Sequence, residues 1–164
     1  MRTIKTKALL AMAIASAMIL NPLTVLSQDN DTYISETAKQ ACIEYGEQYG
    51  ICPELLMAMV EKESSGNPNT ESGGCMGLMQ INPKWHKERM ERLGVMDIFD
   101  ERGNILVAAD YLAELFAEHV EVSLVLDKYN GNSKAQSNYD DGVISDYTKR
   151  ILERSCILEE LHGK

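Results

Sequence analysis

The segment PELLMAMVEKESSGNPN, residues 53–69, decides how this chain folds. Proline is accepted in the first turn of a helix, and the apolar residues behind it recur at helical spacing until the turn signal SSGNPN. One face of this helix carries Cys52, Leu55, Leu56, Met59 and Val60. The next position on that face is Glu63, whereas Glu54 and Glu61 are predicted to point toward solvent. We therefore predict a buried helix whose apolar face ends in one carboxylate.

The position of Glu63 predicts unusual acid–base behaviour. A carboxylate at the end of a buried stripe loses hydration, which disfavours its charged form and raises its pKa. Such a glutamate can hold a proton near neutral pH and donate it as a general acid. The alternative is a glutamate that frays into solvent or bonds a neighbouring backbone amide. Glycines soon after Glu63 favour a ligand groove, because they let a backbone come close to a bound molecule; they are Gly66, Gly73, Gly74 and Gly77.

Five other segments show helical patterns of apolar residues. The first begins at Ser35, a typical N-cap residue, and loosens at Gly46 and Gly50. The others are Pro83 to Gly94, Asn104 to Ala117, Glu121 to Tyr129 and Ser145 to Leu161. Residues 104–117 are apolar on most of the helix circumference, which is typical of the buried centre of a domain. We predict a mainly α domain of five to seven helices packed around that segment, with residues 130–142 as a polar loop.

The N-terminus has the layout of a secretory signal. MRTIKTK carries three positive charges, and the uncharged run ALLAMAIASAMIL follows it. This run is shorter than the roughly 20 residues that span a bilayer. We predict a signal peptide over residues 1–27 with cleavage after Ser27, a flexible lead-in over 28–34 and one domain over 35–164. An uncleaved membrane anchor is the alternative. The protein is expected on the extracellular or cell-wall side of a bacterial membrane.

The chain is acidic, with a net charge of −9 that becomes −12 when the three basic residues of the signal are removed. The phosphates of nucleic acid repel such a protein, so we expect no nucleic-acid partner. An even number of cysteines in an exported chain is typical of disulfides. The four are Cys42, Cys52, Cys75 and Cys156, without any CxxC pair, and we expect neither a metal nor a cofactor.

Two polar turns and one tyrosine are candidates to line a groove beside Glu63. GLMQIN contains Gln80 and Asn82, whose amides both donate and accept hydrogen bonds and suit sugar hydroxyls or N-acetyl groups. KYNGN places Tyr129 and Asn130 at a helix end, and Tyr147 opens the last helix. Ordinary loop satisfaction and core packing are the alternatives for these side chains.

These motifs together resemble the bacterial lytic transglycosylases of the soluble-transglycosylase (SLT), goose-lysozyme-like group. The match covers about residues 35–158 and consists, in order, of Glu63-Ser64, Ser72, GLMQ at 77–80, Asn104-Ile105, YNG at 129–131 and Tyr147. The resemblance implies a lysozyme-like α domain that cuts the β-1,4 bond between N-acetylmuramic acid and N-acetylglucosamine in peptidoglycan. Its catalytic residue would be Glu63, and by the same match the glycan would be surrounded by Ser72, Gln80, Tyr129, Asn130 and Tyr147. Asn82 remains a candidate substrate-binding residue because of its amide.

The resemblance also implies a mechanism that uses one carboxylate. Glu63 would protonate the leaving glycosidic oxygen and then deprotonate the muramic C6 hydroxyl as a 1,6-anhydro ring closes. Ordinary glycosidases use a second carboxylate. Goose-type lysozymes carry an aspartate directly after their GLMQV, where this chain has Asn82, and this departure favours the transglycosylase. Possible second acids are Asp97, Asp110 and Glu71.

Several hypotheses accompany this assignment. Cys75 stands where many members of this family have a small residue, and three pairings of the four cysteines are possible. We hypothesise a Cys52–Cys75 bond and a Cys42–Cys156 bond. A hydrolytic lysozyme, a glycan-binding module that has lost its chemistry and a small helical interaction protein are the rival functions. We expect a monomer that acts on a glycan strand. Because cell walls often carry anionic polymers that would repel this acidic chain, recruitment by secretion or conjugation machinery is a further hypothesis.

Overall fold

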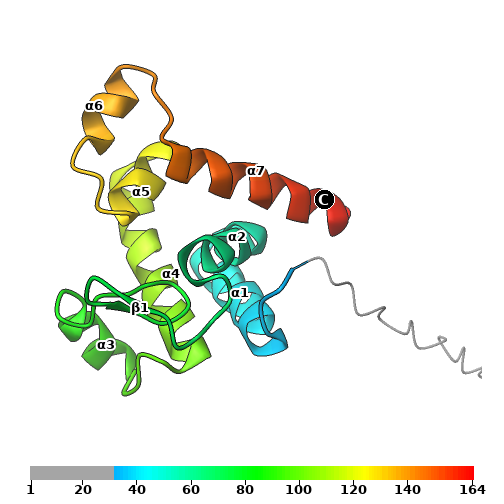
Figure 1. Ribbon diagram of the computed structural model, residues 1–164, viewed down its shortest axis with the longest axis vertical. Helices are drawn as coiled ribbons and strands as arrows, with labels where there is room; N and C mark the ends of the chain where they lie inside the picture. The colour runs from blue at the N-terminus through cyan, green and yellow to red at the C-terminus, as the bar shows by residue number, and fades with distance from the viewer. Residues whose placement is uncertain (1–31) are drawn as a thin grey trace, which may run out of the picture.

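The structure is a computed structural model that describes residues 32–164, so the predicted signal peptide lies outside the described residues. Within that range the chain forms seven helices and one short antiparallel hairpin (Figure 1). The helices are α1 (Glu36–Tyr49), α2 (Pro53–Ser64), α3 (Lys87–Leu93), α4 (Glu101–Glu118), α5 (Val122–Tyr129), α6 (Ala135–Asp140) and α7 (Asp146–Leu161). The hairpin is β1 (Glu71–Ser72) and β2 (Cys75–Met76). The predicted mainly α fold is confirmed.

The first helix begins and ends where the sequence predicts. The Ser35 hydroxyl accepts a 3.0 Å hydrogen bond from the Ala38 N–H, as expected of an N-cap. Gly50 ends α1 in the left-handed conformation, with φ of 68°. Ile34, from the predicted lead-in, is only 6% exposed and belongs to the core. The folded part of the chain therefore begins before Ser35.

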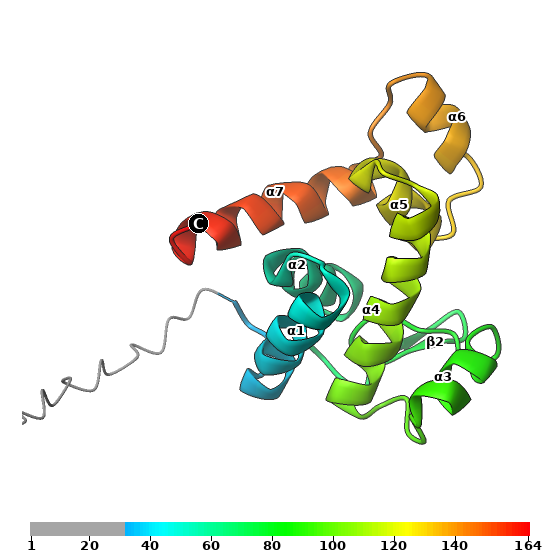
Figure 2. The same cartoon turned by 180° about the vertical axis from the view of Figure 1, so that it is seen from behind.

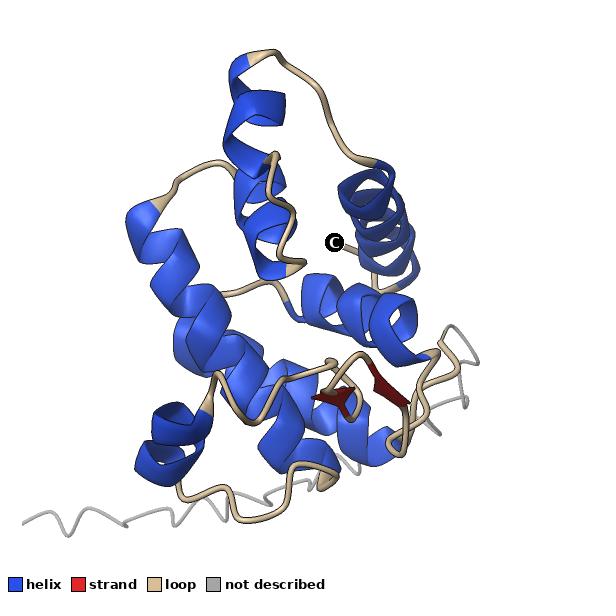
Figure 3. Ribbon diagram, turned by 60° about the vertical axis from the view of Figure 1, so that its left-hand side comes forward, coloured by secondary structure: helices blue, strands red, loops and turns tan. Residues whose placement is uncertain are grey.

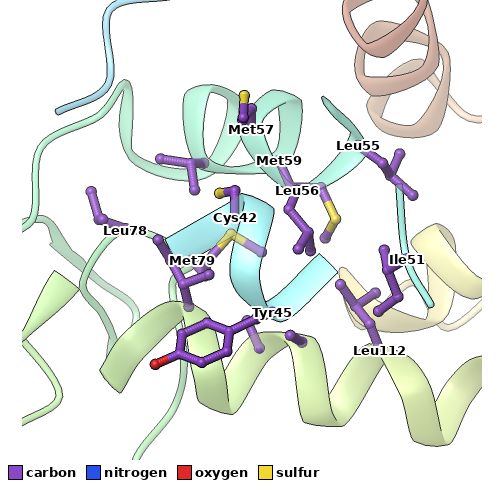
Figure 4. Packing of buried hydrophobic residues seen from close by; sticks show 14 of the residues in the cluster. Cys42, Tyr45, Ile51, Leu55, Leu56, Met57, Met59, Leu78, Met79 and Leu112 are labelled. Atoms are coloured by element: carbon purple, nitrogen blue, oxygen red, sulfur yellow. The ribbon is translucent and has the colours of Figure 1, made fainter. Parts of the chain in front are cut away.

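The core lies where α1, α2 and α4 meet. The helix α1 packs against both α2 and α4, and α2 also packs against α7. Figure 4 shows Cys42 and Tyr45 of α1 between Leu56 and Met59 of α2 and Leu112 of α4. Figure 2 shows the same arrangement from behind, with α3 against the outer side of α4. Burial of these apolar side chains at the three-helix junction is the main driving force for the fold.

The most enclosed helix is α2 rather than α4. Nine of the 12 residues of α2 are buried, against eight of the 18 in α4. The outer face of α4 carries Asp110 and Glu114, which pair with Arg89 of α3, and Asp110 also pairs with Arg92. Helices α1, α3 and α5 do pack on α4. The prediction that residues 104–117 are buried around most of the helix is wrong, because the polar face with Asp110 and Glu114 pairs with α3.

Three short segments differ from the predicted elements. The Asn82 side chain accepts a 3.1 Å bond from the Lys84 N–H and forms a turn, so α3 begins at Lys87 instead of Pro83. The predicted polar loop contains the short helix α6. The glycine-rich segment after α2 forms the hairpin β1–β2, whose Ser72 pairs with Cys75. Each element is short, and none carries a periodic apolar signal.

Glu54 and Glu61 are buried, contrary to the prediction that they face solvent. Glu54 is 2% exposed and accepts hydrogen bonds from His162 Nδ1 at 2.8 Å and Lys164 Nζ at 2.9 Å. Glu61 is 5% exposed and accepts hydrogen bonds from Arg154 Nε at 2.6 Å and Arg154 Nη2 at 2.9 Å. Helix α7 and the residues after it supply these partners, which periodicity within residues 53–64 cannot reveal.

The predicted disulfides Cys52–Cys75 and Cys42–Cys156 are wrong, because all four cysteines are free thiols. Cys52 precedes α2 and Cys75 lies in the hairpin beyond its other end. A helix of 12 residues is about 18 Å long, whereas a disulfide requires Cα atoms within about 7 Å. Cys42 is fully buried in the core, and Cys156 is exposed on α7. The cysteines therefore give no support to the prediction of export.

The ion pairs of Glu54 predict a specific acid sensitivity. Burial raises the pKa of the Glu54 carboxyl, but hydrogen bonds from Lys164, His162 and Cys52 outweigh it and lower the pKa from 4.5 to about 2. A carboxyl with a lowered folded-state pKa stabilises the fold above its unfolded-state pKa and loses that effect as pH falls toward the folded value. We expect Glu54→Gln to flatten the dependence of unfolding free energy on pH between 4.5 and 2, measured by urea denaturation.

The matched control for this measurement is Glu47→Gln, on the exposed part of α1. This change should leave the pH slope of the parent protein intact. An equal slope in the parent and in Glu54→Gln would contradict the prediction.

No helix among residues 32–164 is both long and apolar enough to cross a membrane.

Candidate active site

An open cleft of about 350 Å³ lies at the C-terminal end of α2 and is lined in part by the hairpin. Figure 3 shows the two short strands of this hairpin, in red, among the helices. Its walls come from α2, the hairpin, the segment 80–86, α4 and the end of α5. The lining residues are Glu63, Thr70, Ser72, Cys75, Gln80, Ile81, Asn82, Trp85, His86, Tyr111, Lys128, Tyr129, Asn130 and Gly131. Five of the predicted site residues besides Glu63 are thus in one cleft; the sixth, Tyr147, contacts Glu63 from α7.

Glu63 occupies the last turn of α2, at the end of the apolar face. Burial raises the pKa of its carboxyl above 4.5, although the hydroxyl of Tyr147 and the charge of Lys62 act in the opposite direction. The Tyr147 hydroxyl donates a short hydrogen bond to Glu63 Oε1. Tyr147 itself has a raised pKa, through burial and the neighbouring carboxylate, so it remains a donor. The carboxyl of Glu63 is therefore oriented and holds its proton to a higher pH than an exposed glutamate.

Glu63 is the only carboxylate among the residues that line this cleft. Asp110 is held by Arg89 and Arg92 on α3, and Asp97 accepts a 2.9 Å bond from the Phe99 N–H. Glu71 is exposed on β1 and is not part of the cleft wall. None of the three alternative acids proposed from the sequence therefore shares the cleft with Glu63.

The GLMQ segment, residues 77–80, is fixed from beneath by Asn104. The Asn104 side chain is fully buried; its Oδ1 accepts the Met79 N–H at 2.7 Å, and its Nδ2 donates to Met76 O at 3.0 Å and Ile98 O at 2.8 Å. Gly77 lies directly against it with φ of 78°, and a Cβ at this position would stand 2.2 Å from Asn104 Nδ2. Only glycine fits this approach.

We expect Asn104→Ala to lower the unfolding free energy by about 2–4 kcal/mol, because it leaves the Met79 N–H and the Ile98 carbonyl without their side-chain partner, while Met76 O keeps its bond from the Ile81 N–H. It should also weaken activity, since Gln80 is the last residue of the segment that Asn104 holds. Urea denaturation measures the first effect. Asn69→Ala, at an exposed turn position, is the control and should change stability by less than about 0.5 kcal/mol. Equal stability of the two variants would contradict this role of Asn104.

The other predicted site residues have distinct environments. The Gln80 amide donates to Thr70 O at 3.0 Å and Gly77 O at 2.9 Å, which leaves its oxygen free to accept. The Tyr129 hydroxyl donates to Met79 O at 2.8 Å. Ser72 is exposed on β1, and Asn130 caps the end of α5. Gln80 and Tyr129 therefore shape the cleft wall, and Ser72 and Asn130 present free polar groups.

Sequence reasoning missed an aromatic group on the same cleft. The Tyr111 ring lies 4.7 Å from the His86 ring and 5.5 Å from the Tyr129 ring, measured between centroids. Trp85, the only tryptophan of the chain, is 77% exposed at the rim. A single tryptophan in a polar segment could have indicated Trp85 as a ligand contact. Tyr111 gives no such signal, because it fits the apolar helical pattern of α4. Aromatic rings provide an apolar surface for sugar rings.

Within residues 32–164, no cluster of three or more His, Cys, Asp or Glu side chains is placed to hold a metal ion.

An α-helical domain with a half-buried glutamate at the end of a helix, open to a cleft, has the architecture of the lysozyme-like proteins. Comparison with known proteins agrees: residues 40–145 match the transglycosylase SLT domain family. The chain belongs to this family. It is 40% identical over 93 residues to a transglycosylase of Enterobacteria phage PRD1, a match that covers 56% of this chain and 33% of the phage protein.

The fold is similar to that of a solved lytic transglycosylase, Slt from Pseudomonas aeruginosa. The TM-score is 0.66 at 18% sequence identity, over 76% of this chain and 24% of the Slt chain. At this identity the likeness concerns the fold alone. The chain spans about a third of the phage relative and a quarter of Slt, so the shared part is a single domain of longer proteins.

Proposed function

We propose that this protein is a peptidoglycan lytic transglycosylase, which cleaves the β-1,4 bond between N-acetylmuramic acid and N-acetylglucosamine and forms 1,6-anhydro-N-acetylmuramic acid. The observation that carries the proposal is that Glu63, with its raised pKa, is the only carboxylate lining the cleft among residues 32–164. Membership of the SLT family supports the same activity. The Slt structure is of an inactive mutant in which glutamine replaces a glutamate, so a glutamate is essential in that protein.

The proposed reaction uses the Glu63 carboxyl twice, first as an acid and then as a base. The protonated carboxyl first donates to the glycosidic oxygen, and the bond from that oxygen to C1 of the muramyl sugar breaks. The N-acetyl group of the same sugar stabilises the positive charge at C1. The Glu63 carboxylate then removes the proton of the C6 hydroxyl while O6 bonds C1. The carboxyl regains its proton, and no water is consumed.

The role of Tyr147 leads to a prediction about pH. Its hydroxyl donates to the Glu63 carboxylate, which stabilises the ionised form and lowers the pKa that burial raises. Tyr147→Phe should therefore raise the pKa of Glu63 further. Because the first step requires protonated Glu63, the alkaline limb of the pH profile of kcat should move to higher pH, while kcat itself falls as the carboxyl loses its orientation.

The measurement is the rate of glycan cleavage between pH 4 and 9 for the parent and Tyr147→Phe. Tyr139→Phe, on the exposed helix α6, is the matched control and should reproduce the parent profile. A shift of the limb to lower pH would contradict the hydrogen bond as described.

A hydrolytic lysozyme is the second candidate, and product chemistry separates it from the first. Ordinary glycosidases use two carboxyl groups about 5–10 Å apart, and the cleft residues provide one. Mass spectrometry of muropeptides released from purified peptidoglycan distinguishes the functions. Anhydro-muramyl ends would support the transglycosylase. Reducing ends would support a lysozyme with a further acid. No release would support a glycan-binding module or a requirement for a partner.

The domain bounds, the oligomeric state, export and recruitment are further parts of the proposal. We propose that residues 35–164 form the catalytic domain of a monomer, and that the protein is exported by a signal peptide over residues 1–27. The charged and uncharged runs at the N-terminus support export. Recruitment to a secretion or conjugation apparatus would bring this acidic protein to the cell wall in spite of repulsion by anionic polymers.

A further inference from the structure

A second pocket, of about 340 Å³, adjoins the cleft on the side of α7. It is lined by Lys62, Asn130, Asp146, Tyr147 and Arg150. Asn130 also lines the cleft, and the Tyr147 hydroxyl bonds Glu63. The pocket therefore lies close to the reacting carboxyl, with Tyr147 between them, on the side of α7. The mechanism proposed above uses neither Lys62 nor Arg150.

The cations of this pocket differ from most others in the described part of the chain. Seven basic side chains pair with carboxylates within 4 Å, namely Lys87, Arg89, Arg92, Arg102, Lys149, Arg154 and Lys164. Among residues 32–164, Lys62 and Arg150 have no such partner, and neither has Lys128 on the adjoining cleft wall. Lys84 and Lys134 also lack a carboxylate partner, but they line neither pocket.

These unpaired cations lie in a protein with a net charge of −9, where carboxylates are plentiful. Lys62 Nζ is 5.4 Å from the centroid of the Tyr147 ring, so its position is constrained on the pocket side of that ring. Lys62, Arg150 and Asp146 together give the pocket a charge of +1. That charge suits a ligand with one or two carboxylates better than a polyphosphate. Arg150 presents a planar fork of N–H donors, which matches a carboxylate.

We propose that Lys62 and Arg150 bind a carboxylate of the stem peptide carried by the muramyl sugar, next to the bond that Glu63 cleaves. The inference rests on the proposed function, because the glycan places the muramyl sugar at Glu63 and its peptide in the adjoining pocket. The peptide is the part of such a substrate that carries carboxylates. Recognition is local, since charges more than about 10 Å away are screened by salt and the overall charge of the chain repels anions.

The test compares two ligands that differ only in charge. One is the disaccharide N-acetylglucosaminyl-N-acetylmuramyl bearing L-alanyl-D-glutamate with free carboxyls, and the other is the same compound with both carboxyls amidated. Binding is measured by calorimetry on the full chain carrying Glu63→Gln, so that cleavage does not consume the ligand. We expect the free acid to bind about tenfold more tightly, the size of effect typical of a charge-assisted hydrogen bond.

Adding Arg150→Gln should reduce this ratio to about twofold or less, and adding Lys134→Gln should leave it unchanged. Both positions are exposed, so neither change is expected to disturb folding. Equal binding of the two ligands, or a ratio that Arg150→Gln leaves intact, would overturn the proposal. Displacement of the free acid by inorganic phosphate at equal concentration would also overturn it and assign the pocket to phosphate-bearing polymers.

Two results would distinguish the stem-peptide site from the lytic activity. Charge-dependent binding without any cleavage of peptidoglycan by the parent chain would retain the stem-peptide site and refute the lytic activity. Cleavage with equal binding of the two ligands would retain the activity and refute the site.

Discussion

Glu63→Gln is expected to reduce glycan cleavage by about 10³-fold or more, because general acid catalysis by a positioned group contributes roughly 10²–10⁴-fold and Glu63 is proposed to act in both steps. Glutamine has nearly the same shape and can still accept the Tyr147 hydroxyl, so the cleft should persist. The measurement is the initial rate of muropeptide release, with circular dichroism to verify the fold.

The same substitution should not destabilise the protein. The folded-state pKa of Glu63 is raised, so its contribution to stability is fully present below the unfolded-state pKa and is lost as pH rises through the folded value. At neutral pH the buried carboxylate therefore opposes folding. Removing its charge should leave the unfolding free energy unchanged or increase it. A variant that keeps more than about a tenth of the parent rate would show that another group supplies the proton.

Breaking the ion pair between Glu61 and Arg154 should destabilise the fold about as strongly as the loss of the Asn104 side chain. The two side chains are 4% and 27% exposed and are joined by two hydrogen bonds between α2 and α7. Removing one member of a buried pair costs about 3–5 kcal/mol, because the other charge is left without compensation. We expect Arg154→Gln to lower the unfolding free energy by about 3 kcal/mol and Glu61→Gln by about 2–3 kcal/mol, measured by urea denaturation.

A double-mutant cycle isolates the interaction between these two residues. The double variant should be less destabilised than the sum of the single variants, since neither charge is then left alone. Glu153→Gln is the control, because its pair with Lys149 is 3.9 Å long and exposed, and should change stability by less than about 0.5 kcal/mol. Additive effects would show that the pair does not couple α2 to α7. Cleavage should fall much less in Glu61→Gln than in Glu63→Gln, since Glu61 lines neither pocket.

The sequence supported correct predictions wherever the signal was local. Ser35 caps α1 and Pro53 opens α2 as predicted, because a cap depends on residues only three positions apart. The last helix also lies where its apolar pattern predicts it. Periodicity also identified Glu63 as the polar end of an apolar face. Resemblance to a family added the residues that meet Glu63 across the cleft, including Tyr147, which is 84 positions away.

Sequence reasoning failed where a side chain depends on a distant partner. Glu61 lies 93 positions from Arg154, and Glu54 lies 108 positions from His162, so both were assigned to solvent. The disulfide prediction failed because the direction of α2 sets the distance between Cys52 and Cys75. Trp85 and Tyr111 are adjacent to the site only because the turn before α3 packs against α4.

The sequence by itself determined the longer helices, the N-cap of α1, the candidate acid and the resemblance to a family, since each follows from neighbouring residues or from a linear order of motifs. Only the tertiary structure decided which carboxylates are paired and which one is left in a cleft. The physical reason is that the state of a charge depends on the dielectric surroundings and counter-ions that folding assembles around it. Glu54, Glu61 and Glu63 are all enclosed when α7 packs on α2, but only Glu63 lacks a cation bonded to its carboxylate among the described residues and opens to the cleft.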